Sequence, residues 1–254
     1  HVHFLLQMGL ISLIAALLLE QWRPLAEQRQ LFSQVRRYAG FLESQFHAGE
    51  AQQGMVAWFV AVLPPALLAW ILHALLLYWS PPPLGALLAL AFNVLALYLT
   101  MGFRQFSHFF TDIHLALKQD DLARARELLG TWHGHDCSDL SREEVARLAI
   151  EDALVASHRH VFAVVFWFVL LPGPSGAILY RLATFLSGCW GAPNNAEFAQ
   201  FGRFSRQAFD LLDWLPARFT AAAFAIVGDF EDAIFCWRTQ AARWSDGALG
   251  VVLA

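Results

Sequence analysis

Formal charge is missing from a long part of this sequence. No Lys, Arg, Asp or Glu occurs between Glu50 and Arg104, and charged residues make up 15% of the chain against 57% apolar residues. Soluble domains carry about a quarter charged residues, and one aqueous core at this chain length does not hide so much apolar surface. The scarcity of charge argues against a soluble globular protein and predicts that part of the surface faces lipid.

Cysteines, basic clusters and common catalytic motifs are also scarce. Cys137, Cys189 and Cys236 stand far apart without CxxC spacing, which predicts reduced, buried thiols rather than a disulfide framework or a structural zinc site. The net charge is −4 and the pair Arg36-Arg37 is too small a basic cluster to indicate nucleic-acid binding. No Walker loop, GxGxxG, GxSxG or HExxH occurs, so a bound phosphate would be held by helix ends and arginines.

The sequence is rich in apolar segments of helical length. Predicted transmembrane helices cover about residues 4–19, 55–79 and 84–101, since a hydrocarbon core of about 30 Å needs about 20 residues in a helix. Residues 4–19 carry neither a basic leader nor a small-residue cleavage site, which favours a retained anchor over a signal peptide. Pro64-Pro65 breaks the backbone hydrogen-bond ladder of the second span.

Basic residues are distributed unequally between the loops. Four arginines lie within residues 20–50 and seven basic residues within 104–159, whereas the loop Ser80-Pro81-Pro82-Pro83 carries no charge. The positive-inside rule therefore predicts a multi-pass protein of the bacterial inner (plasma) membrane, with the main basic loops cytoplasmic and the proline turn outside.

The remaining sequence predicts further helices. Residues 104–130 form an amphipathic pattern with Gly130 as a C-cap, and Ser141-Arg142-Glu143-Glu144 is a capping box that starts a helix reaching residue 171. The apolar half of that helix, residues 161–171, is too short to cross a membrane alone, so residues 142–190 are expected to form a re-entrant-type helical hairpin. A helix pair is predicted over about residues 195–228, divided at Pro216.

These elements together predict an all-α fold. We expect a polytopic integral membrane protein forming a single helical domain over residues 1–254. Amphipathic and re-entrant-type helices would pack on about four transmembrane spans.

Ionisable residues in apolar segments are the first candidate functional residues, because each costs free energy to place there. Arg181 lies in a stretch without other charge, and Asp210 and Asp213 are spaced i and i+3 so that they share a helix face. Two carboxylates at this spacing suit Mg²⁺ or a cationic group. The alternative is that they pair with Arg206 and Arg218 and stabilise helix packing.

A second group of candidates lies on the capped helix and in the loop before it. Glu151 on the inner face of the helix is a functional candidate, with a solvated surface charge as the alternative. His133-x-His135 with Asp136 and Cys137 is a weak metal motif, because the second-shell spacing is undefined.

Three other histidines are weaker candidates for metal binding or proton transfer. His158 and His160 point to different faces of a helix and make a poor chelate. His73, inside the second predicted span, is expected to be a hydrogen-bonded core residue rather than a proton relay.

Five stretches have a specific order and spacing, although none is diagnostic alone: residues 121–126, 145–151, 166–167, 176–181 and 213–221. Together they resemble the CobD/CbiB family of cobalamin biosynthesis and its relative AmpE, over most of the chain from Glu20 to Arg238. The resemblance implies a polytopic inner-membrane protein. CobD/CbiB members are adenosylcobinamide-phosphate synthases, which join aminopropanol or its phosphate to adenosylcobyric acid through an ATP- and Mg²⁺-dependent amide bond. AmpE members are membrane sensors or signalling modulators linked to β-lactamase induction.

The resemblance also implies roles for individual residues. Glu151 and Asp210 would be catalytic, and Asp136 would join them in binding Mg²⁺. Tyr180, Arg181 and Arg218 would bind the substrate or its phosphate. The implied cofactors are Mg²⁺ and ATP, and the implied partners are the lipid bilayer and a corrinoid substrate or another membrane protein, with no nucleic acid.

The acidic site departs from the family pattern. The Glu-Ser-x-Ala-Glu-Asn-x-x-Asp motif keeps Glu151, but its second Glu, its Asn and its Asp fall at Val155, Ala156 and Arg159. An arginine in place of a magnesium-binding carboxylate reverses the charge at that position. A degenerate or altered synthase is therefore the first hypothesis, and an AmpE-like non-enzymatic sensor is the alternative.

Overall fold

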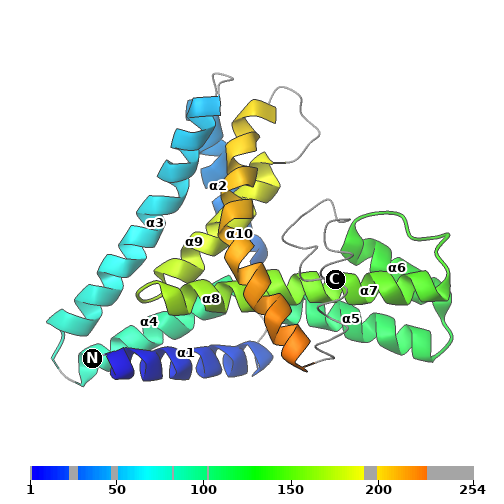
Figure 1. The fold of residues 1–254 in the computed structure, drawn as a ribbon, viewed down its shortest axis with the longest axis horizontal. Coiled ribbons are helices and arrows are strands. Elements are labelled where there is room, and N and C mark those ends of the chain that lie inside the picture. The colour runs from blue at the N-terminus through cyan, green and yellow to red at the C-terminus, as the bar shows by residue number, and fades with distance from the viewer. Residues whose placement is uncertain are drawn as a thin grey trace. The chain divides into compact units, whose positions relative to one another are not determined.

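A computed structural model describes residues 2–22, 28–46, 51–81, 83–101, 103–191 and 199–227 (Figure 1). Throughout these ranges the regular structure is helical, which confirms the predicted all-α class. The chain divides into two compact units, the first made of residues 1–101 and 163–216 and the second of residues 102–162 and 217–254. The single domain expected over residues 1–254 stays a prediction.

The first unit holds the most apolar helices. Its elements are α1 (Val2–Trp22), α2 (Gln28–Phe46), α3 (Ala51–Trp79), α4 (Leu84–Thr100), α8 (Ala163–Leu170), α9 (Ser175–Trp190) and the part of α10 (Ala199–Val227) that ends at Pro216. Helix α1 packs on α4, while α3 contacts α2, α4 and α9. Small residues such as Ala57, Ala61 and Ala183 let these helices approach closely, and Trp58, Trp190 and Phe201 fill the core between them.

The second unit holds the amphipathic helices. Its elements are α5 (Phe103–Lys118), α6 (Leu122–His133), α7 (Arg142–Ser157), the π-helical turn η1 (His158–Phe162) and the rest of α10. Helices α5, α6 and α7 pack around Ile113, Leu129 and Val145, each almost fully buried. Arg142 ties the start of α7 to the turn after α5, through an ion pair with Asp120 and a hydrogen bond to the Leu117 carbonyl oxygen (2.7 Å).

Helix ends follow the local chemistry in one case and depart from it in another. The predicted capping box is confirmed, because the Ser141 and Glu144 side chains each accept a hydrogen bond from the other residue's backbone N–H. The predicted C-cap at Gly130 is wrong. Helix α6 continues to His133 and ends at Gly134, whose φ of 78° is the left-handed conformation that terminates a helix. The sequence Asn194-Asn195-Ala196-Glu197 also predicts an N-cap, which lies outside the described residues.

The predicted division at Pro216 is also wrong. Helix α10 runs from Ala199 to Val227 with Pro216 inside it, and α3 likewise runs through Pro64 and Pro65. A proline within a helix frees the carbonyl oxygen four residues earlier. Trp167 Nε1 donates to the freed Leu212 oxygen at 3.2 Å, and the Tyr38 hydroxyl donates to the freed Val60 oxygen at 3.1 Å. These tertiary hydrogen bonds replace the backbone bonds lost at Pro216 and Pro64.

Two helices in the described ranges are long and apolar enough to cross a membrane: Gln52–Trp79 and Arg142–Leu170. The segments Gln7–Trp22 and Leu84–Thr100 are apolar helices of shorter length, and 17 residues rise about 26 Å along a helix axis. Because α7, η1 and α8 are continuous, the helix over Arg142–Leu170 is longer than the apolar residues 161–171 alone. Four crossings and the re-entrant hairpin over residues 142–190 stay predictions.

Large apolar side chains on the first unit face outward. Leu68 is 66% exposed on α3, Leu87 is 64% exposed on α4 and Leu18 is 62% exposed on α1. A helix that is apolar all round requires protein or lipid on every face. The exposed apolar side chains of these helices are consistent with a membrane protein.

Candidate functional site

The first unit contains a buried hydrogen bond between two of the candidate residues. The Tyr180 hydroxyl of α9 donates to Asp213 Oδ1 of α10 at 2.7 Å, and both residues are buried. The ring of Phe209 packs beside Tyr180 with its centroid 5.9 Å away. Because a carboxylate buried among apolar side chains needs hydrogen-bond donors, this contact positions α9 against α10.

The predicted pairing of Asp210 with Asp213 on one face is only partly realised. Asp210 is exposed, whereas Asp213 is buried against Tyr180. Residues three apart on a helix are offset by about 60°, so the edge of a buried face can pass between them. Arg181, the residue after Tyr180, is half-buried on α9 in the same unit. Tyr180 is thus committed to Asp213, and the substrate role predicted for it stays a prediction.

The second unit contains a buried polar contact at a helix irregularity. His158 is the first residue of η1. Its Nδ1 atom lies 2.8 Å from the Thr220 hydroxyl oxygen of α10, and both side chains are buried. Single π-turns inside α-helices occur often at functional positions, because the extra residue redirects side chains. Thr220 lies two residues after the half-buried Arg218, within the motif that carries the family resemblance. Sequence spacing alone did not indicate this contact.

Glu151 occupies an intermediate environment on α7. Its side chain is 24% exposed, and Oε1 lies 3.5 Å from Arg147 Nε one turn earlier. It is therefore neither a fully solvated charge nor a buried carboxylate. Its carboxyl oxygens are acceptors with more than one lone pair, so the contact with Arg147 leaves acceptor positions for a ligand.

Asp136 lies in the exposed loop between α6 and α7. Its Oδ1 accepts a hydrogen bond from the Ser138 backbone N–H at 3.0 Å, which holds the pKa of the carboxyl below its ordinary value. Beside it, burial raises the pKa of the Cys137 thiol, and the negative charges of Asp136 and Asp152 add to that rise. Cys137 is therefore an inert buried thiol, as predicted. Cys189 is exposed instead, and Cys236 lies outside the described residues.

The histidines of the same loop have a structural partner. His133 Nδ1 lies 2.8 Å from Asp152 Oδ2, which links the end of α6 to α7, and the His135 ring lies 5.3 Å from that of His133. Within the described ranges, no three His, Cys, Asp or Glu side chains gather as a metal site. Magnesium held through substrate phosphates needs only one or two protein carboxylates, and Glu151 suits that mode.

The candidate residues divide between the two units. Tyr180, Arg181 and Asp210 belong to the first unit, while Asp136, Glu151 and Arg218 belong to the second. Tyr180 donates a hydrogen bond to Asp213, Glu151 pairs with Arg147, and Asp136 accepts a hydrogen bond from Ser138. Their assignment as catalytic, metal-binding and phosphate-binding residues stays a prediction.

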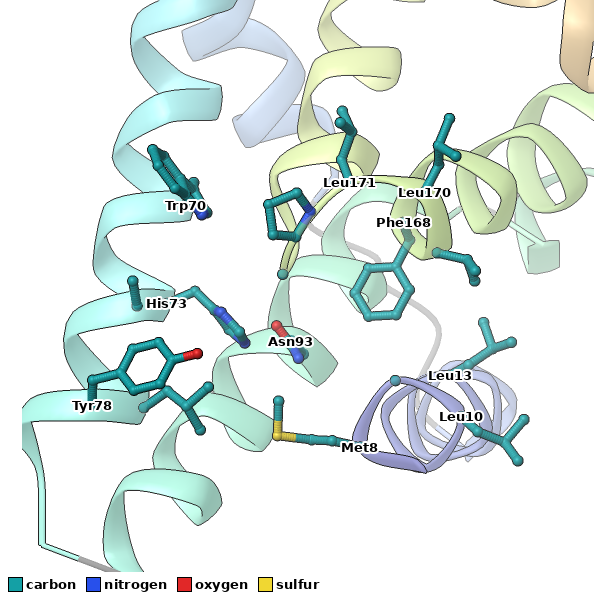
Figure 2. A pocket seen from close by; sticks show the side chains of 16 residues that line it. Met8, Leu10, Leu13, Trp70, His73, Tyr78, Asn93, Phe168, Leu170 and Leu171 are labelled. Carbon is teal, nitrogen blue, oxygen red and sulfur yellow. The ribbon is translucent and has the colours of Figure 1, made fainter. Parts of the chain in front are cut away.

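A cavity in the first unit contains polar atoms that the sequence reasoning missed. Its volume is about 620 Å³, and it lies between α1, α3, α4 and the segment from α8 to Gly173 (Figure 2). His73 is 5% exposed and Asn93 is 2% exposed, and neither His73 Nε2 nor Asn93 Oδ1 has a hydrogen-bond partner among the residues that the structure describes. Figure 2 shows both side chains pointing into the space between α3 and α4. The prediction of a buried His73 is confirmed, but its Nε2 is not hydrogen-bonded.

Gly173 shapes one wall of this cavity. Its φ is +63°, and a Cβ there would lie 2.7 Å from His73 Cγ, so the backbone turn rests directly on the imidazole. Only glycine combines that conformation with that approach. A signal for the site was present in the sequence, since His73 and Asn93 are the histidine and the asparagine of the charge-free run between Glu50 and Arg104.

Comparison with known proteins accounts for the shared motifs. Residues 13–254 match the family described as CobD/CbiB protein. This chain belongs to the CobD/CbiB family. The cobalamin biosynthesis protein CobD of Stutzerimonas stutzeri (strain A1501) is 36% identical to this CobD/CbiB chain over 258 residues, which cover 96% of the chain and 81% of the relative. The protein of the same name from Chromobacterium violaceum is 36% identical over 202 residues, covering 80% of the chain and 61% of the relative.

More distant relatives carry the same name. The CobD protein of Yersinia enterocolitica is 31% identical over 154 residues, covering 54% of this CobD/CbiB chain and 48% of the relative. No solved structure matches the chain. The resemblance stated from the sequence motifs is therefore confirmed at the level of the family.

Proposed function

We propose that this chain is a membrane protein of cobalamin biosynthesis that takes part in forming the amide bond between adenosylcobyric acid and aminopropanol or its phosphate. The observation that carries the proposal is the family match over residues 13–254, together with 36% identity to a CobD protein over 96% of the chain. The relatives named above all carry the name of cobalamin biosynthesis protein CobD.

The reaction sets the requirements for the residues. A side-chain carboxylate of the corrinoid takes the terminal phosphoryl group of ATP and releases ADP, and the amine then displaces phosphate to form the amide. Magnesium would neutralise the phosphate oxygens during the first transfer. We assign the binding of magnesium-ATP in the second unit to Glu151, with Asp136 as a further oxygen ligand, and phosphate contacts to Arg218.

Residues of the first unit would serve the same reaction from other helices. Arg181 is a half-buried cation on α9, suited to a phosphate or carboxylate, and the Tyr180–Asp213 hydrogen bond keeps the α9 segment in place beside it. Asp210, exposed on α10, is the second proposed carboxylate. Tyr180 acts in this scheme as a positioning residue.

The direct test is growth of a synthase-deficient strain that depends on corrinoid supplied as adenosylcobyric acid. Expression of the wild-type chain should restore growth. Glu151→Ala should lower the rate of product formation at least about tenfold, because a charge that binds the ligand is lost. Liquid chromatography of cell extracts would measure the amide product directly. Full rescue by Glu151→Ala would remove Glu151 from the site.

Glu127→Ala is the matched control for that variant. Glu127 pairs with Arg124 on α6 at 2.7 Å. Glu151 pairs with Arg147 on α7 in the same way, so each substitution removes an ion pair with an arginine about one helical turn away. Glu127 is 67% exposed and lies outside the proposed site. Growth with Glu127→Ala should equal that of the wild type.

The second candidate is an AmpE-like membrane sensor or signalling modulator without synthase activity. It is favoured by the loss of family carboxylates at Val155 and Arg159 and by the lack, in the ranges that the structure describes, of a three-ligand cluster. The two functions separate in one experiment. A chain that reaches the membrane and accumulates normally but forms no amide product contradicts the synthase proposal and supports the sensor.

A further inference from the structure

The cavity between α1, α3 and α4 combines two features that rarely occur together. Most of its lining is aliphatic or aromatic, including Leu10, Leu13 and Phe168, yet it contains two deeply buried polar atoms without partners. A buried polar group without a hydrogen bond costs free energy, and in a membrane no bulk water offsets that cost. Two such atoms beside one cavity therefore indicate a hydrogen-bonding occupant.

The chemistry of the two atoms selects the polar group of that occupant. Asn93 Oδ1 is an acceptor, and His73 donates through Nε2 when its proton is on that nitrogen. A hydroxyl group both donates and accepts, so one hydroxyl between the two side chains satisfies both. A charged group does not fit as well, because the cavity lining offers no formal charge to balance it.

The mouth of the cavity selects the rest of the molecule. Leu10, Val169 and Leu170 line the cavity and are 56–63% exposed, and in a bilayer such residues contact acyl chains. Tyr78 and Trp79 end α3, in the manner of aromatic residues at a membrane interface. His73 lies five residues before Tyr78, about 8 Å back along the helix axis, which would put it just below the lipid headgroups if Tyr78 is at the interface.

We propose that this cavity binds a neutral glycerolipid with a free hydroxyl group, a diacylglycerol, taken up from the bilayer. Its hydroxyl would lie between His73 and Asn93, and its acyl chains would leave through the apolar mouth. A volume of about 620 Å³ admits the glycerol backbone and the first part of the chains. None of the residues that line this cavity is assigned to the amide-forming reaction, so the proposal does not depend on that assignment.

The test uses the full chain in nanodiscs of dioleoylphosphatidylcholine that contain a minor amount of either dioleoylglycerol or its 3-O-methyl ether. The two probes differ in the hydroxyl hydrogen, and native mass spectrometry counts the probe retained by the protein. Wild-type protein should retain dioleoylglycerol about tenfold more than the ether, since one or two buried hydrogen bonds distinguish them. Equal retention of the two probes by the wild type would overturn the proposal.

Three variants complete the design. Asn93→Leu removes the acceptor at similar volume and should bring the retention ratio of the two probes to about one. Ala74→Phe fills the cavity and should abolish retention of both probes, whereas Ala86→Phe, at a half-buried alanine of α4 outside the lining, should keep the tenfold preference. A preference that survives Ala74→Phe in folded protein would overturn the proposal even where Asn93→Leu fails to fold.

Discussion

At the scale of single residues, the buried polar side chains of this protein connect helices that are distant in sequence. Tyr180 and Asp213 join α9 to α10, and His158 and Thr220 join the π-turn to the far part of α10. Hydrogen bonds between helices in a membrane contribute about 0.6–2 kcal/mol each, and more is lost when a charged partner stays buried. These contacts therefore affect stability before any chemistry is considered.

Substitution Tyr180→Phe should destabilise the protein by about 1–3 kcal/mol, because the Asp213 carboxylate loses a hydrogen bond in a buried place. Unfolding by denaturant in detergent micelles measures the change. Tyr78→Phe is the control, since Tyr78 is 67% exposed and its hydroxyl is accessible. Equal stability of the two variants would contradict a structural role for the Tyr180 hydroxyl.

At the scale of elements, two helices continue through proline because side chains from neighbouring helices donate to the freed carbonyl oxygens. Trp167 donates to the Leu212 oxygen in α10, and Tyr38 donates to the Val60 oxygen in α3. Helix-breaking residues are tolerated in membrane helices when the freed backbone groups find other partners. The length of α10 thus depends on α8, a helix far from it in sequence.

Trp167→Phe should cost about 1 kcal/mol of unfolding free energy in the wild-type background, and less when Pro216→Ala restores the backbone N–H that bonds Leu212. A double-mutant cycle of Trp167→Phe and Pro216→Ala measures this coupling. Additive effects of the two substitutions would show that the indole does not compensate for the proline.

The capping box of α7 makes a pH-dependent contribution to stability. The Ser141 backbone N–H donates to Glu144 at 2.8 Å, and this hydrogen bond lowers the pKa of Glu144 below its ordinary value of 4.5. A lowered pKa in the folded state means that the contribution is complete above the unfolded pKa and is lost as pH falls through the folded value. Glu144→Gln should therefore reduce the loss of stability as the pH falls below 4.5, as measured by thermal unfolding. Glu143→Gln in the same turn is the control, and an identical pH profile for Glu144→Gln and wild type would contradict the prediction.

At the scale of the whole molecule, the apolar surface of the first unit requires a lipid environment. Exposed leucines on α1, α3 and α4 would bring copies of the chain together in water, whereas acyl chains solvate them. The protein should therefore sediment with membranes and need detergent for extraction.

Reporter fusions test the orientation predicted from the basic loops. An alkaline phosphatase fusion at Ser80 should be active, because that enzyme folds outside the cytoplasm, while a fluorescent protein fused at Asp136 should be active because it folds inside. Fusion activities of the opposite pattern would contradict the positive-inside assignment.

The sequence by itself determined the features that depend on neighbouring residues. The all-α class, the capping box at Ser141 and the family followed from composition, helical spacing and the order of motifs. The capping box is encoded in four consecutive residues, whereas the class and the family are encoded in patterns along the chain, and none of these needed packing information.

Only the tertiary structure decided the features that depend on partners far along the chain. Helix α10 passes through Pro216 because Trp167, 49 positions earlier, lies beside Leu212, and His73 and Asn93 face one cavity because α3 packs on α4. A local pattern indicates that a carbonyl oxygen or an imidazole needs a partner. Which side chain supplies that partner, or whether a cavity is left instead, is decided by how the helices pack.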